Sequence, residues 1–174
     1  MKDEVYVNNI DNYKSSISHE LSIVRYPNVP LKTYSTDWET VAKKIYENED
    51  FGSELNYRNY FETDITALTK GLTSREDVVS AVFDYVKKTM RWNGFYDYYC
   101  HDGVKQAYKS KTGNVAEINL MLTAMLRFAG VSANPLLVST RSNGIALFPN
   151  RTAFNYVIVA VEIEDGLILL DATE

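Results

Sequence analysis

Two side chains that could carry nucleophilic or acid–base chemistry stand next to each other, Cys100 and His101. A thiolate with an imidazole base within hydrogen-bond reach could attack a carbonyl carbon. Adjacent residues usually project in different directions, so we interpret this pair as a loop cysteine and a loop histidine. An enzyme that uses Cys100 as its nucleophile stays open as an alternative.

The supply of metal-ligating side chains is small, because the chain has one cysteine and two histidines, the other being His19. A structural zinc site needs four nitrogen or sulfur ligands, so we predict no metal site. The sequence has no glycine-rich phosphate loop and no dinucleotide-binding fingerprint, and we predict no cofactor.

Three short motifs follow one another in the second half of the chain. Gly113-Asn114-Val115 opens a strongly apolar stretch that ends at Gly130, which predicts a buried helix. Phe154-Asn155-Tyr156 begins a run of strand-forming residues, and Leu169-Leu170-Asp171-Ala172-Thr173 ends a second one. The turn residues Glu164-Asp165-Gly166 between these runs predict a β-hairpin.

This order of elements resembles the transglutaminase-like superfamily, whose core is shared with papain-like cysteine proteases. In that family the buried helix opens at a cysteine nucleophile, the next strand supplies a histidine base, and an aspartate follows the second strand. The resemblance places Val115 at the nucleophile position, Tyr156 at the base position and Asp171 at the position of the aspartate.

The resemblance implies the fold of this family and argues against its activity. Valine has no nucleophilic atom, and tyrosine, with an ordinary pKa of about 10, is a poor base near neutral pH. We therefore expect a catalytically inactive domain that serves as a peptide- or glycan-binding or structural module. The alternative is an active transglutaminase- or cysteine-protease-like acyl-transfer enzyme with a relocated nucleophile, either Cys100 or a hydroxyl.

Asp171 could keep a role without a histidine. We expect the Tyr156 hydroxyl to donate a hydrogen bond to Asp171, because a buried carboxylate without partners is costly. The alternative is an Asp171 that faces water or caps a turn together with Thr173.

Aromatic residues are concentrated between positions 92 and 99 of a chain that has 13 tyrosines. Tyrosine and tryptophan supply rigid contact area with a polar tip, which is typical of peptide and sugar recognition. We therefore predict a binding surface over the former cleft, although the same aromatics could instead fill space around the central helix. Its candidate residues are Trp92, Tyr96, Tyr98, Tyr99, Cys100, His101, Asn114 and Asn155.

Helical periodicity and capping signals predict the elements in front of the central helix. Thr36 and Glu39 form a predicted capping box, and Thr73 and Glu76 form a second one before the clearest amphipathic helix of the chain. Further predicted elements are helices within 51–60, 65–72 and 103–110, and a strand over 131–141 that Pro135 favours at a sheet edge. Helices followed by antiparallel strands indicate an α+β fold with the buried central helix packed on the sheet.

Two parts are expected along the chain. Residues 1–34 resemble the C-terminal remnant of a preceding β-rich domain or a linker, and residues 35–174 form the transglutaminase-like core. Ile17, Leu21 and Ile23 alternate as in a strand, which we expect to pack against the core. The whole chain resembles a fragment of a longer protein, whose flanking domains would be partners.

Composition limits the partners and the location. A net charge of −5 disfavours nucleic acid or an anionic membrane surface, and no apolar run approaches the roughly 20 residues that span a bilayer. The predicted partner is a peptide or a carbohydrate. No hydrophobic signal region begins the sequence, but the resemblance to bacterial proteins that are often exported implies a periplasmic or secreted location.

Overall fold

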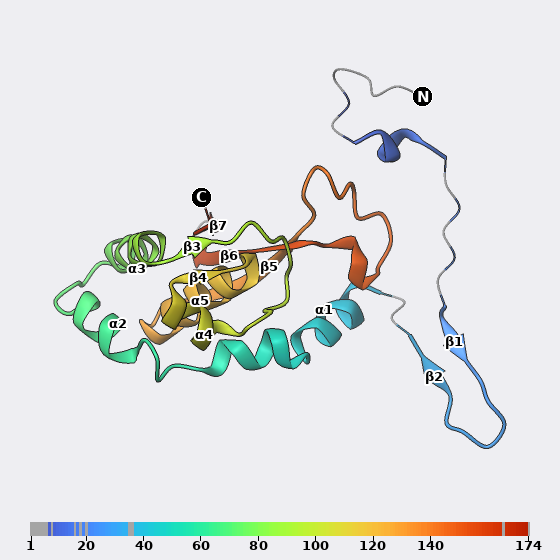
Figure 1. The fold of residues 1–174 in the computed structure, drawn as a ribbon, viewed down its shortest axis with the longest axis horizontal. Coiled ribbons are helices and arrows are strands. Elements are labelled where there is room, and N and C mark those ends of the chain that lie inside the picture. Colours follow the sequence, from blue (N-terminus) through green and yellow to red (C-terminus); the bar gives the residue numbers. More distant parts are fainter. Residues whose placement is uncertain are drawn as a thin grey trace.

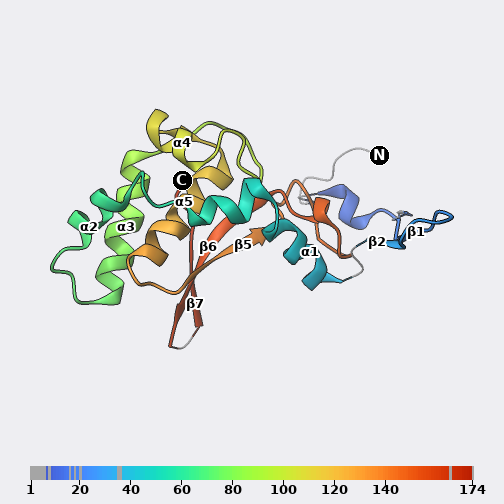
Figure 2. The same cartoon turned by 90° about the horizontal axis from the view of Figure 1, so that it is seen from below.

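Helix α5, Val115–Phe128, lies at the centre of the fold in the computed structural model, which describes residues 7, 9–15, 17, 19, 21–34, 37–164 and 166–173. A three-stranded sheet packs along one side of α5. Helices α2 (Glu62–Thr69), α3 (Arg75–Thr89) and α4 (Val104–Ser110) pack on its other sides (Figures 1 and 2). Every residue from Val115 to Leu126 is buried. A helix that is apolar on nearly all sides can be stable only inside a domain, as predicted.

The ends of α5 are set by local sequence. Asn114 is its N-cap and Glu117 completes a capping box. At the other end Gly130 adopts a φ of +83°. The amide of Val131 donates to the Leu126 carbonyl at 3.0 Å, and the amide of Gly130 donates to the Arg127 carbonyl at 3.1 Å. This Schellman motif confirms Gly130 as the residue that ends the helix.

The sheet has the order β5-β6-β7 and is antiparallel throughout. Its strands are β5, Ala133–Val138; β6, Tyr156–Ile163; and β7, Gly166–Leu170. Pro135 lies in edge strand β5, as predicted, since proline has no backbone N–H to donate to a sheet ladder. The predicted hairpin is β6–β7, and Asp171 follows it directly. Helices on an antiparallel sheet confirm the α+β class.

The remaining helices come earlier in the chain. They are α1, Trp38–Tyr46; a π-turn at Glu49–Ser53; a 3-10 turn at Glu54–Asn56; α2, Glu62–Thr69; α3, Arg75–Thr89; and α4, Val104–Ser110. A further 3-10 turn, Arg151–Ala153, precedes β6.

Both predicted caps shift by one residue. Ser74, rather than Thr73, caps α3, because its hydroxyl accepts from the Asp77 amide. Asp37 caps α1 by accepting from the Thr40 amide at 2.7 Å, while Thr36 lies outside the described residues.

A two-residue parallel pair was not predicted. Strand β3, Arg91–Trp92, pairs with β4, Thr112–Gly113, and places Trp92 opposite Gly113 beside the start of α5. Segments this short carry no periodicity, so only the tertiary fold reveals them.

The N-terminal strand does not pack on the core, which corrects that expectation. Strand β1, Ile23–Val24, pairs with β2, Lys32–Thr33, in a hairpin that lies away from the helices (Figure 1). This local partner satisfies the backbone, and the side chains of Ile17, Leu21 and Ile23 are 87%, 58% and 54% exposed. The 3-10 turn Ile10–Tyr13 precedes this hairpin. Within the described part of the chain, no helix has the length and apolar character needed to cross a membrane.

Candidate functional site

A pocket of about 300 Å³ opens where the start of β6, the end of β5 and the end of β7 meet strand β3. We call it the Trp92 pocket. It is lined by Trp92, Tyr96, Val138, Thr140, Tyr156, Ile158, Asp171 and Thr173. Four of the predicted site residues, Trp92, Tyr96, Tyr156 and Asp171, therefore come together from three separate regions of the sequence.

The Tyr156 hydroxyl donates a hydrogen bond of 2.7 Å to Oδ2 of Asp171, which confirms the contact expected from the sequence. The same hydroxyl lies 2.7 Å from Oγ1 of Thr173. On the other side of the carboxylate, Oδ1 accepts from the amide and the hydroxyl of Thr173 at 3.1 and 2.6 Å. Asp171 thus also caps the turn with Thr173, so both sequence alternatives are present at once.

Asn119, a fully buried residue of α5, ties this carboxylate to the core. Its Nδ2 donates to Asp171 Oδ1 and to the Val157 carbonyl, both at 3.0 Å, and its Oδ1 accepts from the Ala172 amide. Sequence reasoning missed Asn119. A polar residue in the middle of a mostly apolar helix was the available signal, because a buried amide needs partners.

The hydrogen bonds decide the charge of Asp171. Partial burial by itself would raise the pKa of the carboxyl, but the hydrogen bonds from Thr173, Asn119 and Tyr156 outweigh burial and hold the pKa below its usual value. Asp171 is therefore ionised at neutral pH and is a weak base.

Val115 occupies the first turn of α5 and is fully buried. Its amide donates to the Phe95 carbonyl at 3.3 Å, and the Trp92 indole N–H donates to the same oxygen at 3.1 Å. Valine offers no reactive atom at this position, and its side chain does not line the Trp92 pocket. The helix start is therefore packed against the aromatic loop.

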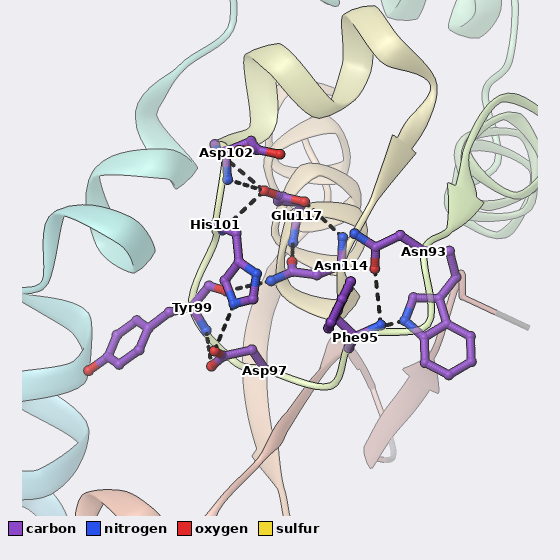
Figure 3. A network of polar contacts seen from close by, with 10 residues as sticks. Asn93, Phe95, Asp97, Tyr99, His101, Asp102, Asn114 and Glu117 are labelled. Atoms are coloured by element: carbon purple, nitrogen blue, oxygen red, sulfur yellow. Dashed lines mark hydrogen bonds and ion pairs between the residues drawn. The ribbon is translucent and has the colours of Figure 1, made fainter.

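Glu117 joins this loop to the helix (Figure 3). Its Oε1 accepts from three consecutive amides, those of residues 101, 102 and 103, at 3.1, 2.6 and 3.1 Å. Its Oε2 accepts from the Asn114 amide at 2.8 Å, and the Asn114 side chain accepts from the Glu117 amide. A carboxylate that is 1% exposed thus fills a nest of backbone donors.

Neighbouring contacts extend this network along the loop. Nδ2 of Asn114 donates to the Tyr99 carbonyl at 2.8 Å, and Oε2 of Glu54 accepts from the Val104 amide at 2.8 Å. The sequence signal for Glu117 was its spacing of three residues from Asn114, which is a capping-box pattern. The part that the spacing could not show is the contact with residues 101–103.

The predicted aromatic surface divides in two. Trp92 and Tyr96 face the pocket, and Tyr96 is 56% exposed. Tyr98 is buried, and its hydroxyl donates to the Arg151 carbonyl. The ring of Tyr99 points away from the network of Figure 3 and packs edge-on against Phe51. These two tyrosines fill space around the core, which was the alternative interpretation.

Three other predicted site residues also lie outside the pocket lining. Asn114 is fully buried as the cap of α5, and Asn155 exchanges hydrogen bonds with the amide and hydroxyl of Thr140. His101 is exposed and lies 3.0 Å from the carboxylate of Asp97.

Cys100 is 5% exposed, and its side chain belongs to the hydrophobic core. Burial, reinforced by the nearby carboxylates of Glu54 and Glu117, raises the pKa of the thiol far above its ordinary value. A buried protonated thiol is not an activated nucleophile. Among the residues that the structure describes, no three His, Cys, Asp or Glu side chains gather to hold a metal.

The sequence profile of the transglutaminase-like superfamily matches residues 64–171, which run from within α2 to Asp171 after β7 and include every lining residue of the Trp92 pocket except Thr173. The chain belongs to the transglutaminase-like superfamily. The matched range includes Val115, Tyr156 and Asp171, the residues that the sequence resemblance is expected to place at the family's triad positions.

Solved structures resemble this transglutaminase-like chain in fold. A proposed protease from Parabacteroides distasonis is 20% identical, with a TM-score of 0.56 over 76% of this chain and 25% of the other. A proposed cysteine protease from Cytophaga hutchinsonii is 13% identical, with a TM-score of 0.49 over 73% of this chain and 43% of the other. The periplasmic domain of TgpA from Pseudomonas aeruginosa is 17% identical, with a TM-score of 0.48 over 69% of this chain and 45% of the other.

The chain therefore spans between a quarter and less than half of the length of these three proteins. No curated protein matches it in sequence.

Proposed function

We propose that this transglutaminase-like domain is catalytically inactive and binds a peptide or glycan in the Trp92 pocket. The observation that supports this most directly is Val115, a fully buried side chain without a reactive atom at the family's nucleophile position. Tyr156 at the base position is engaged with Asp171 and Thr173. The pair needed for covalent acyl transfer, a nucleophile and its base, is missing from this site.

The competing function is an acyl-transfer enzyme with a relocated nucleophile, and the surroundings of each substitute argue against it. Cys100 is buried and its pKa is raised, so it lacks the thiolate that attack requires. A hydroxyl such as that of Thr173 would need a base within reach. Its neighbour Asp171 has a lowered pKa, and a carboxylate stabilised in this way accepts a proton poorly.

Binding is favoured over a purely architectural role because the pocket is open and aromatic. Tyr96 and Trp92 present large side chains at its wall, and Tyr96 is more than half exposed, with no side-chain hydrogen bond to any residue that the structure describes. A volume of about 300 Å³ is at the lower end of ligand pockets and suits one side chain or one sugar ring.

The test combines an activity assay with a binding assay. A glutamine-containing peptide with hydroxylamine measures acyl transfer, and a fluorogenic peptide mixture measures hydrolysis; both should remain at the level of buffer. Binding of capped dipeptides and of neutral trisaccharides is followed by NMR at the Trp92 indole and the Tyr96 ring. Shifts that disappear in Tyr96→Ala and persist in Phe148→Ala are expected, because Phe148 is 67% exposed and outside the pocket.

Turnover that is lost on Cys100→Ser would overturn the proposal in favour of an enzyme. No response to any peptide or sugar would favour the architectural role instead. The same proposal includes an extracytoplasmic location for the parent protein, to be tested by fractionation of cells that express it.

A further inference from the structure

The Trp92 pocket combines aromatic rings with a single charge. Among the eight described residues that line it, three are aromatic, Trp92, Tyr96 and Tyr156, and Asp171 is the only charged one. The remaining four are Val138, Thr140, Ile158 and Thr173, so this described lining contains no lysine or arginine. Aromatic faces carry negative potential and attract cations. Both kinds of group in this pocket therefore favour a positively charged ligand.

The three rings line the same pocket and contact one another at an angle rather than face to face. The ring centroids of Trp92 and Tyr96 are 5.0 Å apart at an interplanar angle of 69°, and those of Tyr96 and Tyr156 are 5.7 Å apart at 44°. Two of the three are fixed in place, because the Trp92 indole donates to the Phe95 carbonyl and the Tyr156 hydroxyl donates to Asp171. A cation would therefore meet surfaces that are already positioned, which reduces the entropic cost of binding.

The hydrogen bonds of Asp171 distinguish between kinds of cation. The carboxylate already accepts four, from the Asn119 amide group, the Thr173 amide, the Thr173 hydroxyl and the Tyr156 hydroxyl. Three of these bonds reach Oδ1 and one reaches Oδ2. A carboxylate has about four acceptor positions, so Asp171 offers its charge and at most one free acceptor position, on Oδ2. A primary ammonium has three N–H groups, so it would lose more hydrogen bonds with water than this carboxylate can replace. An alkylated ammonium has few or no N–H groups that need acceptors, so it gives up few hydrogen bonds with water when it enters the pocket.

We propose that the Trp92 pocket binds a quaternary ammonium group. This inference rests on the proposed binding function and names the chemistry of the ligand. The group could belong to a free choline-type molecule or to a trimethylated lysine side chain, and both would present the same three methyl groups and the same charge to the rings.

The experiment titrates the intact chain with choline and with 3,3-dimethylbutan-1-ol, the neutral carbon analogue of the same shape. NMR shifts of the Trp92 indole and the Tyr96 ring report on the pocket. Choline is expected to bind roughly fivefold or more tightly than the neutral analogue, because only the charged molecule gains the cation–π attraction. Acetylated trimethyllysine amide and acetylated lysine amide form a second pair, in which the trimethylated member should bind more tightly.

Two variants of Tyr96 distinguish the contribution of its aromatic ring to binding from that of its hydroxyl. Tyr96→Phe keeps the aromatic face and should keep choline binding, whereas Tyr96→Ala should lose it by a similar factor of roughly five. Because Tyr96 is exposed and its side chain makes no hydrogen bond within the described part of the chain, neither change endangers the fold. Asp171→Asn should weaken choline and leave the neutral analogue unaffected.

Equal binding of choline and its neutral analogue would overturn the inference. So would preference for the unmethylated lysine. Binding of a capped dipeptide or a trisaccharide at Tyr96 with no response to any quaternary ammonium would also overturn it, while leaving the proposed function supported. Comparison of choline with trimethyllysine then tells which source of the group the pocket prefers.

Discussion

Replacement of Glu117 by glutamine tests whether one buried carboxylate holds the aromatic loop to helix α5. The carboxylate accepts four backbone N–H groups, three at Oε1 and one at Oε2. Glutamine has nearly the same shape but only one oxygen. In the more favourable orientation of the glutamine side-chain amide, its oxygen stays toward residues 101–103. Its NH₂ group then points at the backbone N–H of Asn114, so two hydrogen-bond donors face each other.

The expected loss follows from these contacts. Hydrogen bonds to a charged group are worth more than neutral ones, and three donors share one atom, so neutralisation costs about 1–2 kcal/mol in total. The Asn114 amide, left buried without an acceptor, costs about 1–3 kcal/mol more. Together Glu117→Gln should lower the free energy of unfolding by about 2–5 kcal/mol, a large share of the 5–15 kcal/mol typical of a domain.

Urea unfolding followed by circular dichroism measures this loss, and hydrogen exchange of the amides of residues 101–103 locates it. Glu39→Gln is the matched control, since Glu39 also lies in the first turn of a helix but is exposed. The Glu39→Gln control should lose less than about 1 kcal/mol of unfolding free energy, which is the size of a helix-dipole effect. A Glu117→Gln variant no less stable than this control, with unchanged exchange at 101–103, would refute the reasoning.

Two further predictions concern Cys100 and Tyr156. Alkylation of Cys100 in the native protein should be slower than in the urea-unfolded protein by a factor of roughly ten or more, and it should stay slow at pH 8, because the thiol is buried and its pKa is raised. The rate is measured from the intact mass of the protein. Fast labelling of the native protein would contradict the burial of this thiol. Tyr156→Phe should lower stability by about 1–2 kcal/mol at pH 7, because it removes a hydrogen bond to an ionised carboxylate. The lowered pKa of Asp171 stabilises the fold above the unfolded value of about 3.9, and this contribution is lost as pH falls through the folded pKa. The deficit of the variant should therefore shrink at pH 3 relative to pH 7, and a deficit that grows on acidification would disprove the role of the charge.

Local patterns predicted most of the core. The apolar run after Asn114 gives α5, the amphipathic stripe gives α3, and the turn at 164–166 gives the β6–β7 hairpin, because periodicity and turn chemistry act over a few residues. The predicted contact between Tyr156 and Asp171 also follows from this hairpin, which brings the start of one strand near the end of the other.

Contacts between distant segments could not be predicted in this way. The sequence alone gave the expectation that valine and tyrosine stand where the family has its nucleophile and base, since residue identity needs no coordinates. Only the tertiary structure decided which loop aromatics face the pocket: Tyr96 does, whereas Tyr98 is buried. It also decided that Glu117 accepts amides from a loop 14 to 16 residues before it. The physical reason is that side-chain direction in an irregular loop has no period, and its hydrogen-bond partners are fixed only when the fold brings remote segments together.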